Sequence, residues 1–268
     1  MEKRVAILAT MDTKGTECRF LKEEIEKLGG RAFLIDIGVV GVTDIEVDID
    51  KATVAEEGGR SLGDLLSNPT RQEASQVMVK GAITLLKKLI EEKRIHSLIS
   101  LGGTQGTNVC CEIMQDLPYG FPKIMLSTMA SGDTSSFVGI KDITMMFSVS
   151  DILGLNPFSR RILANAAGAG YGMAQVPHSI DFGAGKPVIG ISNLGVLTRG
   201  TMKAIELFGE RGYEVIVFHA VGSGGRAMEQ MMRDGIIEAV FDFGMGEIAD
   251  AVHEGLRAGD DDRLTVAG

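Results

Sequence analysis

Residues 97–107, Ser97-Leu98-Ile99-Ser100-Leu101-Gly102-Gly103-Thr104-Gln105-Gly106-Thr107, join a short apolar run to a glycine-rich turn. The apolar run predicts a buried strand over 97–101, and the residues after the turn predict a helix over 106–115. Glycines let a backbone approach an anion, and a helix N-terminus attracts negative charge. The turn over 102–107 is therefore predicted to bind phosphate. Close packing of helix on strand is the alternative explanation for one or two of its glycines.

The same alternation of strand and helix extends in both directions along the chain. Strands are predicted over 5–10, 32–37, 123–128, 188–192, 214–219 and 236–241. Helices are predicted around them, including 51–57, 74–89, 159–175, 201–208, 227–232 and 247–256. Alternating strands and helices are typical of parallel sheets flanked by helices, which is the α/β class. Proline, glycine and charge concentrate near 178–187, so we expect two lobes, residues 1–180 and 187–268. The second has only three predicted strands and looks incomplete.

Composition excludes several classes of partner. The 268 residues carry a formal net charge of −9, contain no Trp and contain only three Tyr. An acidic chain with few aromatic rings disfavours nucleic acid and anionic membranes as partners. The three cysteines form no CxxC pair, which favours small buried side chains in a reducing compartment. No signal peptide is recognisable, and no apolar run approaches the ~18 residues of a membrane span. We therefore expect a cytoplasmic protein.

The loop after the first strand also carries candidate ligand-binding side chains. In open parallel sheets, ligands bind outside the carboxyl ends of the strands. Thr10, Asp12, Thr13 and Lys14 follow the first predicted strand and offer two hydroxyls, a carboxylate and an ammonium group. They predict a contact with phosphate or with a metal–phosphate complex. The alternative is that Asp12 or Thr13 caps the following helix and Lys14 is simply solvated.

Two further loops have a similar composition. Ser131, Gly132 and Asp133 follow another strand, and Asp133 is a candidate for holding Mg²⁺ or a ribose hydroxyl, although the segment also reads as an ordinary turn. The fourth loop repeats the pattern of 102–107 in the second lobe, with Gly222, Gly224, Gly225 and Arg226. His219 precedes it, either as a structural residue or as a catalytic acid or base.

Several strong signatures are absent from the sequence. It contains no G-x-x-x-x-G-K-[ST], no G-x-G-x-x-G and no G-x-S-x-G, and no spacing of His, Cys and Asp that suggests a zinc site. Spacing alone therefore predicts an anion-binding α/β protein with two lobes, and it predicts no reaction.

The same loops carry a resemblance to a known family. The matching motifs span essentially the whole chain: Thr10–Gly15, Gly102–Thr107, Ser127–Asp133, Ser150-Asp151-Ile152, Asn156, Ser159-Arg160-Arg161, Asn165–Gly168 and His219–Met228. They resemble the family named for the N-terminal ATP-binding domain of the tomato mosaic virus resistance protein. The resemblance implies two Rossmann-like lobes with a nucleotide in the cleft. For the plant member it also implies inhibition of viral replication through binding of the replication protein. It implies no reaction.

Two departures from the family pattern bear on the predictions. Thr104-Gln105 stand where family members usually have Ser-Gly, so Gln105 is expected to be strained if that position needs a positive φ. Family members also continue about a hundred residues or more beyond this length, so the chain looks C-terminally truncated or split from a companion. We therefore expect a homo-oligomer, or a companion chain that supplies the rest of the second lobe.

Together the residues and the resemblance favour an ATP-binding protein. The amides of 102–107 would hold the phosphates with Thr13 and Lys14, and Gly222–Arg226 would approach from the second lobe. Mg²⁺ would take Asp12 or Asp133 as ligands. One alternative is an enzyme that acts on a small phosphorylated metabolite, with His219 as acid or base. The other is a regulatory module whose binding to a protein partner depends on nucleotide.

Overall fold

Two separate parallel sheets organise the chain, which a computed structural model describes over residues 2–67, 70–177, 180, 185–260 and 263–267. Contacts divide it into residues 1–179, called unit 1, and residues 180–268, called unit 2. The predicted α/β class with parallel sheets flanked by helices is confirmed. Much of the predicted boundary at 178–187 lies outside the described residues.

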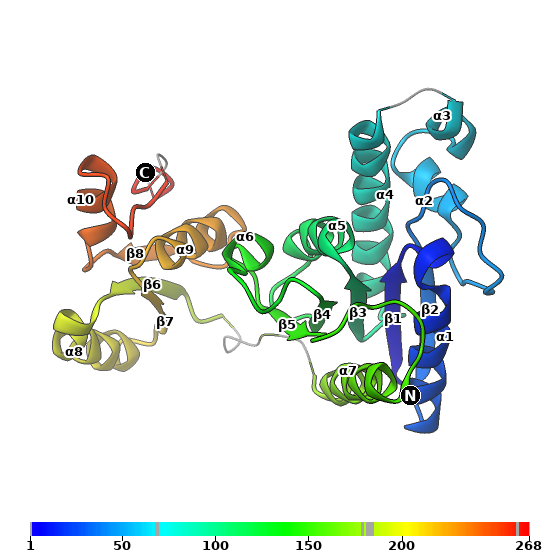
Figure 1. The fold of residues 1–268 in the computed structure, drawn as a ribbon. Helices are drawn as coiled ribbons and strands as arrows, with labels where there is room; N and C mark the ends of the chain where they lie inside the picture. The colour runs from blue at the N-terminus through cyan, green and yellow to red at the C-terminus, as the bar shows by residue number, and fades with distance from the viewer. Residues whose placement is uncertain (1, 68–69, 178–179, 181–184, 261–262, 268) are drawn as a thin grey trace. The chain divides into compact units, whose positions relative to one another are not determined.

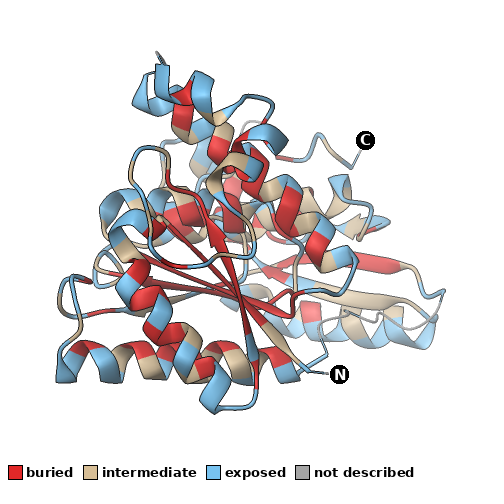
Figure 2. Ribbon diagram, turned by 90° about the vertical axis from the view of Figure 1, so that its right-hand side faces the viewer, coloured by how far each residue is buried: buried red, intermediate tan, exposed pale blue. Residues whose placement is uncertain are grey.

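Unit 1 is built on a five-stranded parallel sheet in the order β2-β1-β3-β4-β5. Its strands are β1 (Arg4–Ala9), β2 (Arg31–Asp36), β3 (Ser97–Gly102), β4 (Lys123–Ser127) and β5 (Ile143–Phe147). β3 and β4 are buried at every residue, which is expected where helices cover both faces of a parallel sheet. Figure 2 shows this as a buried sheet between partly exposed helices.

Helices cover the two faces of this sheet (Figure 1). α1 (Met11–Lys27) and α7 (Pro157–Gln175) pack on one face, and α4 (Arg71–Glu91) and α5 (Thr104–Gln115) pack on the other. α2 (Lys51–Glu57) packs on α4 and on α3 (Leu62–Ser67), while α6 (Ser135–Val138) lies against α5. Gly170 of α7 sits directly over the sheet, because a Cβ there would lie 2.5 Å from Ile99 Cδ1. The predicted close packing of this small-residue helix is confirmed.

Unit 2 has a three-stranded parallel sheet in the order β7-β6-β8. The strands are β6 (Val188–Asn193), β7 (Glu214–His219) and β8 (Ala239–Phe241). They alternate with α8 (Thr198–Glu210), α9 (Ser223–Arg233) and α10 (Gly246–Val252), and a 3-10 turn, η1 (Gly195–Leu197), precedes α8. β6 is buried along most of its length, whereas β7 and β8 leave apolar side chains exposed.

Several elements differ from the sequence-based expectation. β5 and α3 were not predicted, and β8 and α10 are shorter than the predicted 236–241 and 247–256. β5 is an edge strand with a half-exposed Met pair, Met145 and Met146, and methionine carries little strand preference. The three cysteines are free and buried, as predicted. No helix in the described part of the chain is both long and apolar enough to cross a membrane.

Candidate functional site

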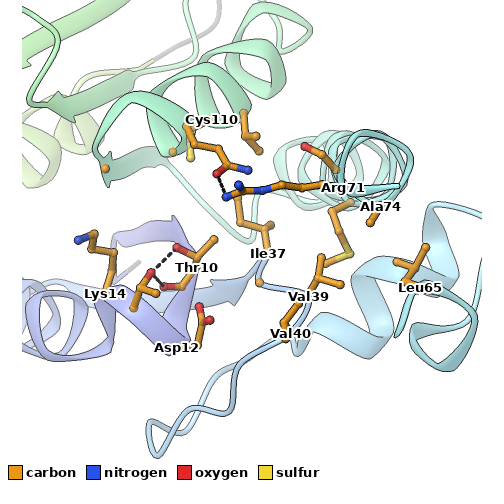
Figure 3. Close-up of a pocket in the computed structure, with 18 of the residues that line it drawn as sticks. Thr10, Asp12, Lys14, Ile37, Val39, Val40, Leu65, Arg71, Ala74 and Cys110 are labelled. Atoms are coloured by element: carbon orange, nitrogen blue, oxygen red, sulfur yellow. Dashed lines mark hydrogen bonds between the residues drawn. The ribbon is translucent and has the colours of Figure 1, made fainter. Parts of the chain in front are cut away.

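A pocket of about 800 Å³ opens at the carboxyl edge of the unit 1 sheet. Every residue that lines it belongs to unit 1. The first turns of α1 and α5 form one part of its wall, and residues 37–40 with α3 and α4 form the rest (Figure 3). The structure therefore brings together two of the four loops singled out in the sequence, the one after β1 and the one after β3.

The loop after β1 supplies Thr10, Asp12, Thr13 and Lys14 to the pocket. The hydroxyls of Thr10 and Thr13 are 2.9 Å apart and hydrogen-bond each other, so neither threonine side chain caps α1. The ammonium of Lys14 donates to the carbonyl oxygen of Ile152, in the segment that follows β5. Lys14 is thus held in place by a neutral acceptor.

Asp36, at the end of β2, fixes the start of α1. Its Oδ1 accepts hydrogen bonds from the amides of Met11 at 3.0 Å and Gly38 at 2.8 Å, and the residue is only 4% exposed. Sequence reasoning missed this residue. Its signal was an aspartate that directly follows a buried apolar strand, where an uncompensated carboxylate would be costly.

Asp12 lies beside Asp36 at the pocket wall. A Cβ on Gly38 would lie 3.3 Å from Asp12 Oδ1 and 3.1 Å from Asp36 Oδ1, so both carboxylates flank this glycine. Within the described residues, no group of three or more His, Cys, Asp or Glu side chains is arranged to hold a metal ion. Asp12 is the carboxylate of the pocket lining, and one carboxylate together with ligand phosphates is a common arrangement for Mg²⁺.

The loop after β3 leaves a helix N-terminus open to the pocket. Gly103 is the N-cap of α5 and no side chain caps this end, whereas α2, α4 and α7 are capped by Asp50, Thr70 and Asn156. The amide of Thr107 bonds to Gly103 O at 2.8 Å. The three amides before it, at residues 104–106, have no acceptor within a helix, because the first turn offers none.

The residues of this loop have distinct roles. A Cβ on Gly102 would lie 2.9 Å from Gly106 Cα, so Gly102 is required for the turn itself. A Cβ on Gly103 would meet nothing closer than Thr128 Oγ1 at 3.9 Å, so this position is open. Thr107 turns away and bonds to Ser127 Oγ at 2.6 Å, in the interior. The prediction of a strained backbone at Gln105 is wrong. This residue lies in α5 and is not among the described residues with positive φ.

The loop after β4 does not contribute to this pocket. Ser131, Gly132 and Asp133 are exposed and lie outside its lining. The Asp133 carboxylate accepts a hydrogen bond from the amide of Ser135 at 2.9 Å, which lowers the pKa of the carboxyl group. This geometry is that of the ordinary turn considered as the alternative.

In unit 2, the loop after β7 already holds a carboxylate. Glu247 is fully buried, and its Oε1 accepts from the amides of Gly222 at 2.6 Å and Gly225 at 3.0 Å. A Cβ on Gly225 would lie 2.0 Å from Glu247 Oε2, so this glycine makes room for a side chain of the protein. A phosphate at these amides, as the sequence predicted, would have to displace Glu247. Arg226 lies 3.8 Å from Asp260, and His219 is exposed.

The pocket also has residues that the sequence did not suggest. Arg71, in the first turn of α4, donates to the side-chain oxygen of Gln105 in the first turn of α5 (Figure 3). Apolar side chains from residues 37–40, α3, α4 and α5 also line the wall: Ile37, Val39, Val40, Leu65, Ala74, Met78 and Val109. No local motif marks them, because they come from segments distant in sequence.

Comparisons with known proteins cover the whole length of the chain. A "UPF0261 protein" from Clostridium tetani is 45% identical over 100% of this chain and 66% of its own length. One from Rhizobium meliloti is 37% identical over 98% of this chain and 64% of its own length. The ToMV resistance protein Tm-1(GCR237) of Solanum lycopersicum is 35% identical over 97% of this chain and 37% of its own length. The chain thus spans just under two thirds of these two bacterial relatives.

A solved structure of a putative UDP-N-acetylglucosamine 2-epimerase from Listeria monocytogenes aligns with 100% of this chain and 72% of its own, at 10% identity and a TM-score of 0.36. Models of an uncharacterised protein family match residues 3–179 as its N-terminal domain and residues 186–268 as its C-terminal domain. The resemblance seen in the sequence agrees with the tomato relative. The chain therefore belongs to the UPF0261 family.

Proposed function

We propose that the unit 1 pocket binds a nucleotide, with ATP as the first candidate, and that the first turn of α5 receives its phosphates. The observation that supports this most is the uncapped N-terminus of α5, which opens into a pocket of about 800 Å³. Free amides and the helix dipole at such a position favour a bound anion.

The neighbouring side chains suit a phosphorylated ligand. Thr13 and Lys14 share the pocket lining with the first turn of α5 and offer a hydroxyl and a cation. Asp12 would bring Mg²⁺ to the phosphates and so would offset the repulsion between its own carboxylate and the ligand. A bound Mg²⁺ supplies charge neutralisation of the phosphate oxygens.

The aliphatic part of the wall suits the rest of a nucleotide. Ile37, Val39 and Met78 offer apolar surface to a base, and ligand pockets typically combine such surface with a few well-placed polar groups. The resemblance to a family named for an ATP-binding domain favours ATP among phosphorylated ligands. These side chains alone do not distinguish adenine from other bases.

Thermal unfolding with and without ligand tests this proposal. A ligand that binds only the folded state stabilises it by about 2.7 kcal/mol at a hundredfold excess over Kd. MgATP is expected to raise the melting temperature of unit 1. An unchanged melting temperature at millimolar ATP, ADP, AMP and inorganic phosphate would contradict the proposal.

A matched pair of variants places the site. Gly103→Val adds a side chain where the turn is open, so binding is expected to be lost while the melting temperature of the free protein stays near that of the wild type. Lys14→Ala removes one charge among several donors, and we expect a tenfold to hundredfold weaker affinity, about 1–3 kcal/mol. A folded Gly103→Val protein with normal affinity would move the phosphate site off this turn.

A further inference from the structure

Arg71 is a cation of the pocket that neither the glycine-rich loops nor the family resemblance brought forward. It occupies the first turn of α4, where Thr70 and Glu73 form a reciprocal capping box. That box fixes where α4 begins and therefore where the Arg71 side chain starts. From there the side chain reaches across to Gln105 in the first turn of α5, so two helices meet at the pocket through this contact (Figure 3).

The partner of Arg71 is neutral. A guanidinium has five N–H donors, and the contact with Gln105 uses few of them. Among the described residues no carboxylate pairs with Arg71. The nearby Glu73 carboxylate accepts a hydrogen bond from the backbone amide of Thr70 at 2.8 Å. Arg263 in unit 2 shows the opposite case, because it is surrounded by Glu229, Asp242 and Glu247. The charge of Arg71 is thus available to an anion in the pocket.

We propose that Arg71 is a phosphate-binding residue, and that the pocket prefers a diphosphate or triphosphate group over a monophosphate. The inference rests on the proposed function, because it needs an anion at the first turn of α5. Lys14 of α1 and Arg71 of α4 are the two cations of the pocket lining, and Figure 3 shows them on different helices. One phosphate group would be neutralised by one of these cations and the α5 amides, whereas linked phosphates use both cations.

Gln105 orients Arg71 when no ligand is bound. Its side-chain oxygen accepts from the guanidinium beside the amides that would receive a phosphate. A phosphate oxygen there is a stronger acceptor than a neutral amide oxygen, because a charged partner strengthens the hydrogen bond. Arg71 is therefore expected to exchange Gln105 for phosphate with little movement. Lysine carries the same charge but lacks the planar fork, so Arg71→Lys tests geometry separately from charge.

Equilibrium binding of ATP, ADP, AMP and pyrophosphate to Arg71→Ala, Arg71→Lys, Lys14→Ala and Lys80→Ala tests this inference. Lys80 is exposed further along the same helix and lies outside the pocket lining, so Lys80→Ala removes an equal charge as the matched control. Arg71→Ala is expected to weaken ATP, ADP and pyrophosphate about tenfold or more and AMP less than about threefold. Arg71→Lys is expected to fall between Arg71→Ala and the wild type, and Lys80→Ala to change affinities less than about twofold.

The outcomes separate this inference from the proposed function. Unchanged ATP affinity in a folded Arg71→Ala protein, with weaker binding by Lys14→Ala, overturns the role of Arg71 and leaves the proposed function standing. Equal losses for AMP and ATP overturn the preference for linked phosphates. If the wild-type protein binds none of the four probes, both the proposed function and this inference are overturned. Melting temperatures of the free variants show whether a lost affinity reflects lost folding.

Discussion

The glycine-rich loops 102–107 and 222–226 look alike in sequence and differ in what their helix N-termini hold. Both follow a strand of a parallel sheet and open a helix, α5 in unit 1 and α9 in unit 2. In unit 2, the buried carboxylate of Glu247 accepts from the amides of Gly222 and Gly225. In unit 1, no side chain caps α5 and the helix opens into a pocket. A strand–glycine–helix pattern therefore predicts an anion site, but a residue distant in sequence decides whether that anion is the protein's own carboxylate.

The carboxylate in unit 2 depends on one arginine, and its removal is expected to have the largest effect. Arg263 is nearly buried and lies 2.8 Å from Glu247, 2.6 Å from Asp242 and 3.4 Å from Glu229. Arg263→Met would leave Glu247 and Asp242 without this cation, whereas Glu229 keeps Arg233 at 4.0 Å. Removing one partner of a buried ion pair typically destabilises by about 3–5 kcal/mol.

Chemical denaturation followed by hydrogen exchange in each unit measures this effect. Unit 2 is expected to lose its protection in Arg263→Met at denaturant concentrations where unit 1 keeps its own. Equal stability of unit 2 in the variant and the wild type would show that the buried carboxylate of Glu247 does not depend on Arg263.

Alanine at one glycine of each loop, Gly225 in unit 2 and Gly103 in unit 1, gives a smaller contrast. In Gly225→Ala the new Cβ would lie 2.0 Å from Glu247 Oε2 and 2.6 Å from Arg263 Nε, so the ion cluster must shift. We expect a loss of about 1–3 kcal/mol, as for overpacked interiors. Gly103→Ala meets open space and is expected to lose less than about 1 kcal/mol, the usual difference between glycine and alanine at an N-cap. Urea unfolding of both variants measures the two losses, and equal losses would contradict the comparison.

The two sheets differ in how far their strands are buried, and this difference is expected to affect association of the protein more weakly than the substitutions above affect its stability. β3 and β4 are fully buried in unit 1, whereas Val217 of β7 is 40% exposed and Phe241 of β8 is 39% exposed in unit 2. Exposed apolar side chains at the edge of a sheet favour pairing with another chain. We therefore propose that unit 2 associates with a second copy or with a companion chain.

Light scattering across micromolar concentrations tests this association. The mean molecular mass of the wild-type protein is expected to rise with concentration, and Phe241→Lys is expected to reduce that rise. A variant in α4, Lys80→Ala, serves as a control because it leaves unit 2 untouched. A monodisperse wild-type monomer throughout would contradict self-association by the chain alone.

The smallest expected effect concerns the thiol that lines the unit 1 pocket. Burial raises the pKa of Cys110 to about 12, so very little thiolate is present at pH 8. Because the thiolate is the reactive form, alkylation of Cys110 in the folded protein is expected to be slow, and it rises with pH as the thiol ionises. Mass spectrometry after iodoacetamide treatment measures it, with the urea-unfolded protein as reference. Equally fast labelling of folded and unfolded protein would show that the pocket wall around Cys110 opens freely.

The sequence predicted most of the fold because the buried strands are short apolar runs that alternate with helical patterns. The helix predicted over 51–57 matches α2, and the predicted strand 97–101 matches β3 to within one residue. β5 was not predicted, because its residues are partly exposed and methionine does not favour strands in particular. Periodicity detects burial on both faces of a sheet far better than an edge strand.

The candidate site was predicted only in part, for a different reason. Thr10, Asp12, Lys14 and Gly102–Gly106 lie where β1 and β3 end and the next helices begin, and the carboxyl ends of parallel strands meet at one edge. Arg71, Asp36 and the aliphatic wall come from a helix start, a strand end and segments far apart in sequence. Likewise, nothing local shows that Glu247 would occupy the loop of unit 2. Such pairings arise from tertiary packing, which a single sequence does not display.

Hydrogen exchange of the wild-type chain with and without MgATP compares the two glycine-rich loops in one experiment. ATP is expected to slow exchange in residues 102–107 and 10–15 and to leave residues 222–226 unchanged, because Glu247 already accepts from the amides of Gly222 and Gly225. Slower exchange confined to residues 222–226, or no change in either loop at saturating nucleotide, would contradict this prediction.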